Sequence, residues 1–122
     1  MMMSEEQLTT MFKCLAGLKD RPAMYIGDHD PKKALIFLAG FTTALAVCSG
    51  FVDHRGEVKQ RIIKSRGWNW TNTGLIPQMK ERGMSPEDMI AELVSVEIEM
   101  IKQITAIKLD STLEGNTPNE RS

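Results

Sequence analysis

Residues capable of catalysis or metal binding are few and scattered in this chain of 122 residues. His29 and His54 are isolated in the sequence and lack the spacing of metal ligands. No Ser-His-Asp or Cys-His arrangement can be identified, and Gly27, Gly40 and Gly50 are too far apart for a phosphate-binding loop. The sequence therefore predicts no catalytic residue, no metal ion and no cofactor.

One carboxylate interrupts the apolar pattern of the last predicted helix. At about 100° per residue, Glu97 falls within the apolar stripe that contains Ile90 and Ile101. Such a carboxylate needs a partner, because burial disfavours its charged form. We predict that Arg21 and the Tyr25 hydroxyl meet Glu97 in a buried polar cluster that fixes the first loop on the last helix. A lone catalytic Glu97 without a second acid or base has little chemistry to perform, so a minor enzyme built on Glu97 and Tyr25 is only a third option.

A second set of acidic residues lies on the opposite face of the same helix. Asp88, Glu92 and Glu99 share this face, which is either solvated or able to receive a basic protein. Charge is segregated along the chain, although its net value is only −1. Seven basic and three acidic side chains give residues 53–84 a charge of +4, whereas three basic and eight acidic ones give residues 85–122 a charge of −5.

The basic segment 55–70 supports a different interpretation. It places Trp68 and Trp70 beside three basic side chains, Arg61, Lys64 and Arg66. Aromatic stacking and phosphate neutralisation are the means by which proteins bind single-stranded nucleic acid. A small nucleic-acid-binding regulator is therefore the alternative function, although the net charge of −1 argues against a protein that mainly coats nucleic acid.

Helical periodicity dominates the chain and predicts an all-α fold. We expect one compact bundle of about five helices over residues 1–109, with long first and last helices and a polar tail at 110–122. The first expected helix begins at Ser4 and ends near Lys19, and the last begins at Ser85. Three further helices are expected between them, at about 31–49, 57–66 and 75–82. The helix at about 31–49 is apolar nearly all round, so we expect it to be the buried centre of the bundle.

The loop before that helix has strong local signals. Pro22 fixes its own φ, and Gly27 can adopt the positive φ that reverses the chain. Met24 and Tyr25 are too apolar for a solvated loop, so we expect them to fill part of the core. Asp30 is a suitable N-cap for the helix that follows.

The expected cellular compartment is inferred from two kinds of segment, a membrane-spanning helix and a secretory signal, that we do not find in the sequence. The longest apolar segment is shorter than the roughly 20 residues that cross a bilayer, and the N-terminus has no basic region of a secretory signal. Cys14 and Cys48 are expected to be free, structural thiols in a reducing compartment. These features predict a cytoplasmic protein without a membrane partner.

The segment Arg-Pro-Ala-Met-Tyr-Ile-Gly at 21–27 resembles sequences in two groups of proteins. It is similar to a signature of type II topoisomerase ATPase subunits, but the helix that follows has no Asp, Glu or Asn to serve as base or magnesium ligand. ATPase activity is therefore not implied.

The wider pattern adds Leu-Ile-Phe-Leu-Ala-Gly-Phe at 35–41, a Trp-containing connector and a final amphipathic helix. This pattern resembles small bacterial proteins, among them immunity proteins of contact-dependent growth inhibition and related polymorphic toxin systems. The resemblance implies a non-enzymatic antidote that binds the C-terminal domain of one cognate toxin, often a nuclease, and blocks its active site or substrate path.

The acidic face gives this resemblance a candidate binding site. Nucleases that bind phosphate tend to be basic, so an acidic face can imitate the nucleic-acid backbone. We therefore predict that Asp88, Glu92 and Glu99 contact a basic RNase or DNase toxin, with Asp28 and Asp30 as the second choice.

Overall fold

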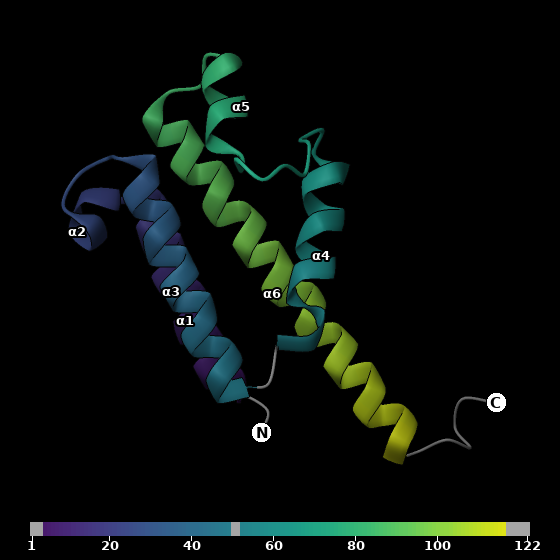
Figure 1. Cartoon of the computed structure of the whole chain (residues 1–122). Helices are drawn as coiled ribbons and strands as arrows, with labels where there is room; N and C mark the ends of the chain where they lie inside the picture. The colour runs from purple at the N-terminus through teal and green to yellow at the C-terminus, as the bar shows by residue number, and fades with distance from the viewer. Residues whose placement is uncertain (1–3, 50–51, 117–122) are drawn as a thin grey trace.

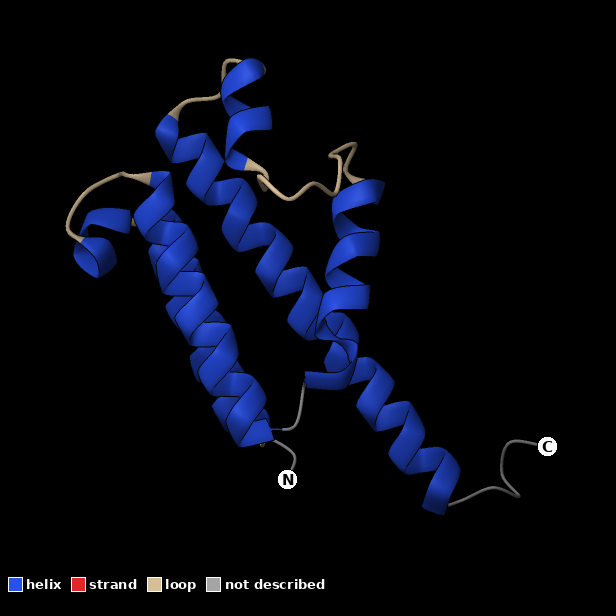
Figure 2. Ribbon diagram, viewed as in Figure 1, coloured by secondary structure: helices blue, strands red, loops and turns tan. Residues whose placement is uncertain are grey.

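The computed structural model describes residues 4–49 and 52–116, and this part of the chain forms six helices and no strand (Figure 2). The helices are α1 (Glu5–Asp20), α2 (Pro22–Ile26), α3 (Pro31–Ser49), α4 (Val52–Ser65), α5 (Ile76–Glu81) and α6 (Pro86–Asn116). The predicted all-α fold is confirmed. The additional helix is α2, a single turn in the segment that we expected to be a loop.

The helix at the centre of the bundle is α6 rather than α3. It packs against α1 and α3 on one side and α4 on the other, while α5 lies near its N-terminal end (Figure 1). The prediction that the helix at 31–49 is buried was wrong, because α3 leaves Ile36 71% exposed and Val47 79% exposed. Apolar residues on every side of a helix indicate that other protein segments pack against it. They do not show which of its faces the rest of the chain covers.

The central position of α6 explains its composition. A helix with neighbours on more than one side must bury a broad face, and α6 does so with both aliphatic and methionine side chains. Its buried apolar residues are Met89, Ile90, Leu93, Val94, Val96, Met100, Ile101 and Ile104. The shorter apolar stripe of α1, which consists of Met11, Leu15 and Leu18, packs against it.

The predicted N-terminal caps are present at three helices. Ser4 and Gln7 form a capping box, in which the Gln7 amide donates to Ser4 Oγ at 3.1 Å and the Ser4 amide donates to Gln7 Oε1 at 2.9 Å. At α6, Ser85 Oγ accepts from the Asp88 amide at 3.1 Å. Asp30 accepts from the Lys32 amide at 3.0 Å at the start of α3. These contacts satisfy amides that have no partner within the helix.

The last helix is longer than expected. It continues to Asn116, through part of the segment at 110–122 that we predicted to be a tail. Residues 117–122 lie outside the described part of the chain. The first strong helix breaker in this stretch is Gly115, so the sequence itself contains no reason for the helix to end at 109.

The Arg21–Gly27 segment forms a corner between α1 and α3. Gly27 has the predicted positive φ of 86°, and Pro22 is buried in the first position of α2. Contrary to prediction, Met24 does not fill the core, since 74% of it is exposed, and Tyr25 is 40% exposed. The Tyr25 ring instead meets Phe37 of α3 edge to face, with the ring centroids 6.3 Å apart.

Candidate functional site

Glu97 is buried as predicted, but its partners are not those that we predicted. Only 3% of the residue is exposed. The Thr42 hydroxyl donates to Glu97 Oε2 at 2.8 Å, and the Lys59 ammonium donates to Oε1. Arg21 and Tyr25 are exposed, so the predicted buried cluster of these two residues with Glu97 was wrong. The reason is that α3 lies between α2 and α6 (Figure 1). Glu97 of α6 instead bonds to Thr42 of α3 and Lys59 of α4.

Thr42, Glu97 and Lys59 connect three helices, and we call these three residues the polar bridge. Arg55 reinforces it by donating to the Thr42 carbonyl oxygen at 3.3 Å. A cavity of about 210 Å³ lies on the side of Arg55, and one of about 180 Å³ lies toward the α4–α5 connector; Lys59 and Glu97 line both. The polar bridge therefore lies between two cavities in the cleft that α3 and α4 form over α6.

The predicted acidic face is largely occupied by the protein itself. Glu92 accepts from Arg66 Nη1 at 2.8 Å and from the Trp68 indole at 2.7 Å. Glu99 accepts from Arg66 Nη2 at 2.7 Å and from Nε at 3.2 Å. Asp88 remains exposed. The sequence left two possibilities for this face, solvent or a basic partner, and the structure adds a third, in which Arg66 of the same chain pairs with Glu92 and Glu99.

Opposite charges on α4 and α6 therefore compensate one another. Burial lowers the pKa of Arg66, but the hydrogen bond with Glu99 and the charges of Glu92 and Glu99 outweigh this effect and raise the pKa overall. The polar bridge adds the pair of Lys59 and Glu97 across the same interface. The segregation of charge in the sequence thus reflects, in part, contacts between two helices of this chain.

Asp28 and Asp30 shape the turn that begins α3. Asp28 Oδ2 pairs with the Lys33 ammonium at 2.6 Å, and Asp28 Oδ1 accepts from the Asp30 amide at 3.0 Å. The hydrogen bond from Lys33 is the main cause that lowers the pKa of Asp28. Both carboxylates lie near the surface, at the end of the bundle where α3 and α6 begin (Figure 1).

The two tryptophans of the connector differ in their surroundings. Trp68 is 5% exposed, donates to Glu92, and lies under the Arg82 guanidinium at 4.0 Å from the ring centroid. Trp70 is 49% exposed, and its indole has no hydrogen-bond partner among the described residues. Trp68 is therefore part of the core. Of the five residues named for the nucleic-acid hypothesis, Trp68 and Arg66 are engaged in internal contacts, whereas Arg61, Lys64 and Trp70 are exposed.

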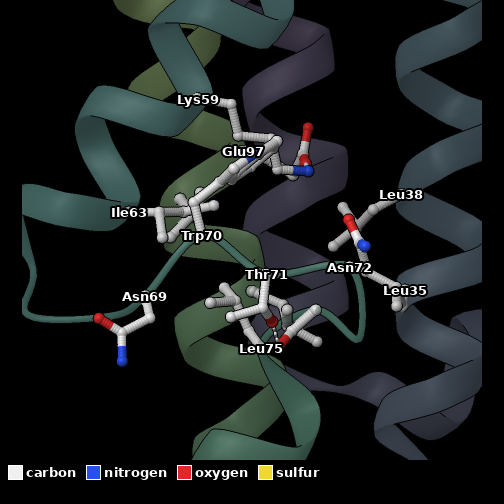
Figure 3. Close-up of a pocket in the computed structure, with 13 residues that line it drawn as sticks. Leu35, Leu38, Lys59, Ile63, Asn69, Trp70, Thr71, Asn72, Leu75 and Glu97 are labelled. Atoms are coloured by element: carbon white, nitrogen blue, oxygen red, sulfur yellow. Dashed lines mark hydrogen bonds and ion pairs between the residues drawn. The ribbon is translucent and has the colours of Figure 1, made fainter.

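Trp70 instead forms one wall of the cavity of about 180 Å³, which we call the Trp70 pocket (Figure 3). Its aliphatic walls come from three helices and include Leu35, Leu38, Ile63, Leu93 and Val96. The labelled side chains in Figure 3 place Trp70 near Lys59 and Glu97, with Leu35 and Leu38 on the opposite helix.

The connector that carries Trp70 is held by hydrogen bonds. The Gln78 side chain accepts from the Asn69 amide at 2.9 Å and donates to the Asn69 carbonyl at 2.8 Å. The Arg82 guanidinium donates to the Gly67 carbonyl at 2.7 Å. Gln78 of α5 and Arg82, which follows α5, thus hold the residues on both sides of Trp68. The connector that forms this wall of the pocket is therefore a supported segment.

Exposed apolar side chains gather on two helices. Among the described residues, five of the six large exposed apolar side chains lie on α2 or α3, and we call them the apolar face; they are Met24, Tyr25, Leu35, Ile36 and Val47. The sixth is Trp70. No charged residue occurs in α3 between Ala34 and Val47. The sequence signal for this surface was the all-round apolarity of α3, which we interpreted as burial.

The remaining predicted features concern cysteines and metal ions. Cys14 is a free, half-buried thiol, whereas the side chain of Cys48 lies outside the described residues. Among the side chains that the structure describes, in residues 4–47 and 55–106, no three His, Cys, Asp or Glu are grouped so as to hold a metal ion. No helix in the described ranges is both long enough and apolar enough to span a membrane.

The chain matches no protein-family model, no curated protein and no solved structure.

Proposed function

We propose that this chain is an immunity protein that binds and neutralises the toxin domain of a contact-dependent growth inhibition or related system. The observation that carries this proposal is the apolar face on α2 and α3. Large apolar side chains that gather in exposed positions on a folded protein are typical of a binding site for another protein. In this proposal the chain acts in the cytoplasm by occlusion of the toxin and performs no reaction itself.

The motif that carries the resemblance also positions the apolar face. Buried Pro22 and the left-handed Gly27 set the direction of α2 between its two neighbours. The edge-to-face contact of Tyr25 with Phe37 holds α2 against α3. Met24 of the same short helix is exposed, which supports a role of the motif in building the interface.

The charged part of the proposed interface differs from the one suggested by the sequence. Arg66 pairs with both Glu92 and Glu99 and offsets one of their two negative charges, so they offer less negative charge to a partner than the sequence suggested. Asp28, Asp30 and Asp88 lie at the end of the bundle where α3 and α6 begin (Figure 1). We assign these three carboxylates to the rim of the interface, where charge affects the association rate more than the affinity.

A growth assay tests the proposal. Cells that express the toxin domain from the neighbouring reading frame should survive when this chain is co-expressed. Ile36→Glu places a charge in the middle of the apolar face and should weaken toxin binding about tenfold or more, with loss of protection. Lys64→Glu is the matched control, because it changes charge at an exposed position on α4, away from the apolar face.

Both variants must first give the wild-type circular dichroism spectrum, since only folded variants are informative. Failure of the wild-type chain to protect against this toxin would refute the proposed function. Protection by Ile36→Glu equal to that by Lys64→Glu would instead remove the apolar face from the interface.

A further inference from the structure

We propose that the Trp70 pocket receives one aromatic side chain with a polar tip, tyrosine or tryptophan, from the bound toxin domain. This inference rests on the proposed function, because it takes the partner to be a protein. It assigns a role to Trp70 and Lys59, which lie outside the apolar face and line the pocket together with Leu35.

The size of the pocket limits what it can hold. Its volume is about 180 Å³, and an apolar cavity of roughly 150 Å³ can hold one benzene ring. The pocket therefore suits one aromatic ring with a small polar substituent. A helix or a strand does not fit into such a volume, so these elements would have to remain outside and insert a single side chain.

The chemistry of the walls favours a ring with a polar tip. Aliphatic side chains from α3, α4 and α6 surround the ring position, and the exposed indole of Trp70 offers an aromatic surface for stacking. The polar bridge reaches the same pocket through Lys59 and Glu97. Each oxygen of Glu97 accepts one hydrogen bond, and a carboxylate has about four acceptor positions. Glu97 can therefore also accept from a phenol or an indole N–H.

The position of the pocket connects it with the proposed interface. Leu35 lines the pocket and is 38% exposed, and both Leu35 and the next residue, Ile36, belong to the apolar face. A partner that covers the apolar face is thus adjacent to the pocket mouth. The buried anchor surrounded by a wider contact area is the usual arrangement at the energetic centre of a protein interface.

A second copy of this chain is a poorer occupant. Among the described residues, the exposed large aromatic side chains are Tyr25 and Trp70. Tyr25 is held against Phe37, and Trp70 already forms the wall of its own pocket. The side chain must therefore come from a different protein.

The pocket can be tested without the toxin. We would titrate the purified chain with p-cresol, which represents a tyrosine side chain, and with toluene, which lacks the hydroxyl. The indole N–H signal of Trp70 and the methyl signals of Leu38 and Ile63 report binding by NMR. We expect p-cresol to bind in the millimolar range and toluene to bind about fivefold more weakly.

A pair of variants locates the binding. Leu35→Trp fills the pocket mouth from a partly exposed position and should abolish p-cresol binding, whereas Ile36→Trp on the adjacent exposed position should retain it. Absence of p-cresol binding to the wild-type chain would overturn the inference. Equal binding of toluene and p-cresol would overturn the assignment of a polar tip.

Competition connects the pocket with the toxin. With p-cresol at ten times its dissociation constant, the apparent dissociation constant for the toxin domain should rise about elevenfold, because both compete for one site. An unchanged toxin affinity under these conditions would refute the pocket as a toxin contact and leave the proposed function intact. A toxin that does not bind to a chain that does bind p-cresol would refute the proposed function and, with it, the assigned occupant.

Discussion

Removal of the Lys59 ammonium should destabilise this protein far more than removal of a surface ammonium. In Lys59→Met the side chain keeps much of its apolar length, but Glu97 loses one of its two hydrogen-bond donors. The Glu97 side chain is 4% exposed and that of Lys59 is 29% exposed, so the pair is buried mainly on the carboxylate side. The substitution therefore leaves a buried carboxylate with the Thr42 hydroxyl alone.

The expected magnitude follows from this burial. Breaking a buried ion pair by removing one partner reduces stability by roughly 3–5 kcal/mol. We expect about 3 kcal/mol, the lower end of this range, because the cavities on both sides of Glu97 give water access to the carboxylate. The double variant Lys59→Met/Glu97→Leu should recover to within about 1 kcal/mol of the wild type, since it leaves no charge in the cleft.

Urea denaturation followed by circular dichroism at 222 nm measures these free energies of unfolding. With a slope of roughly 1.5 kcal/mol/M, a loss of 3 kcal/mol lowers the midpoint by about 2 M. The control is Lys33→Met, which breaks a pair with Asp28 whose side chains are 53% and 45% exposed, and it should leave the urea midpoint nearly unchanged. A Lys59→Met effect as small as that of Lys33→Met would refute this interpretation of the polar bridge.

Three further predictions concern other contacts. Arg66→Met should lower the free energy of unfolding by about 2 kcal/mol, because two partly buried carboxylates lose their partner; urea denaturation measures this, and no change would contradict the network. The Asp28 carboxyl should titrate below 3.8 by NMR and return toward 3.8 in Lys33→Met, so the stabilisation from this pair is present above pH 3.8 and lost as the pH falls through the lowered value. In Gly17→Ala the new Cβ would come within 2.8 Å of Tyr25 Cζ, so the ring should leave its position and lose its NOE contacts with α3. Retention of these NOE contacts would contradict that packing, while stability should change by less than about 1 kcal/mol, because the gain in helix propensity offsets the lost aromatic contact.

Local features of the fold could be predicted because neighbouring residues determine them. The capping box at Ser4 and the cap at Ser85 depend on residues three positions apart, and Gly27 needed only its own conformational freedom. Helical periodicity likewise predicted that Glu97 is buried. Each of these inferences concerns one segment of the chain and does not require knowledge of which helices pack together.

The partners across helices could not be predicted in the same way. Choosing Lys59 over Arg21 for Glu97 requires knowing that α4 rather than α2 packs on α6. The assignment of α3 to the centre failed for a related reason, because apolarity on every side is compatible with burial and with an apolar binding surface. The opposite charges of residues 53–84 and 85–122 were the available signal that these segments pack against each other.

Hydrogen exchange of this chain with and without the toxin domain, followed by mass spectrometry, tests the central claim most directly. Amides of peptides from α2, α3 and the α4–α5 connector around Trp70 should exchange more slowly in the complex. Protection confined to α4, with none on α2 or α3, would contradict the apolar face as the binding surface.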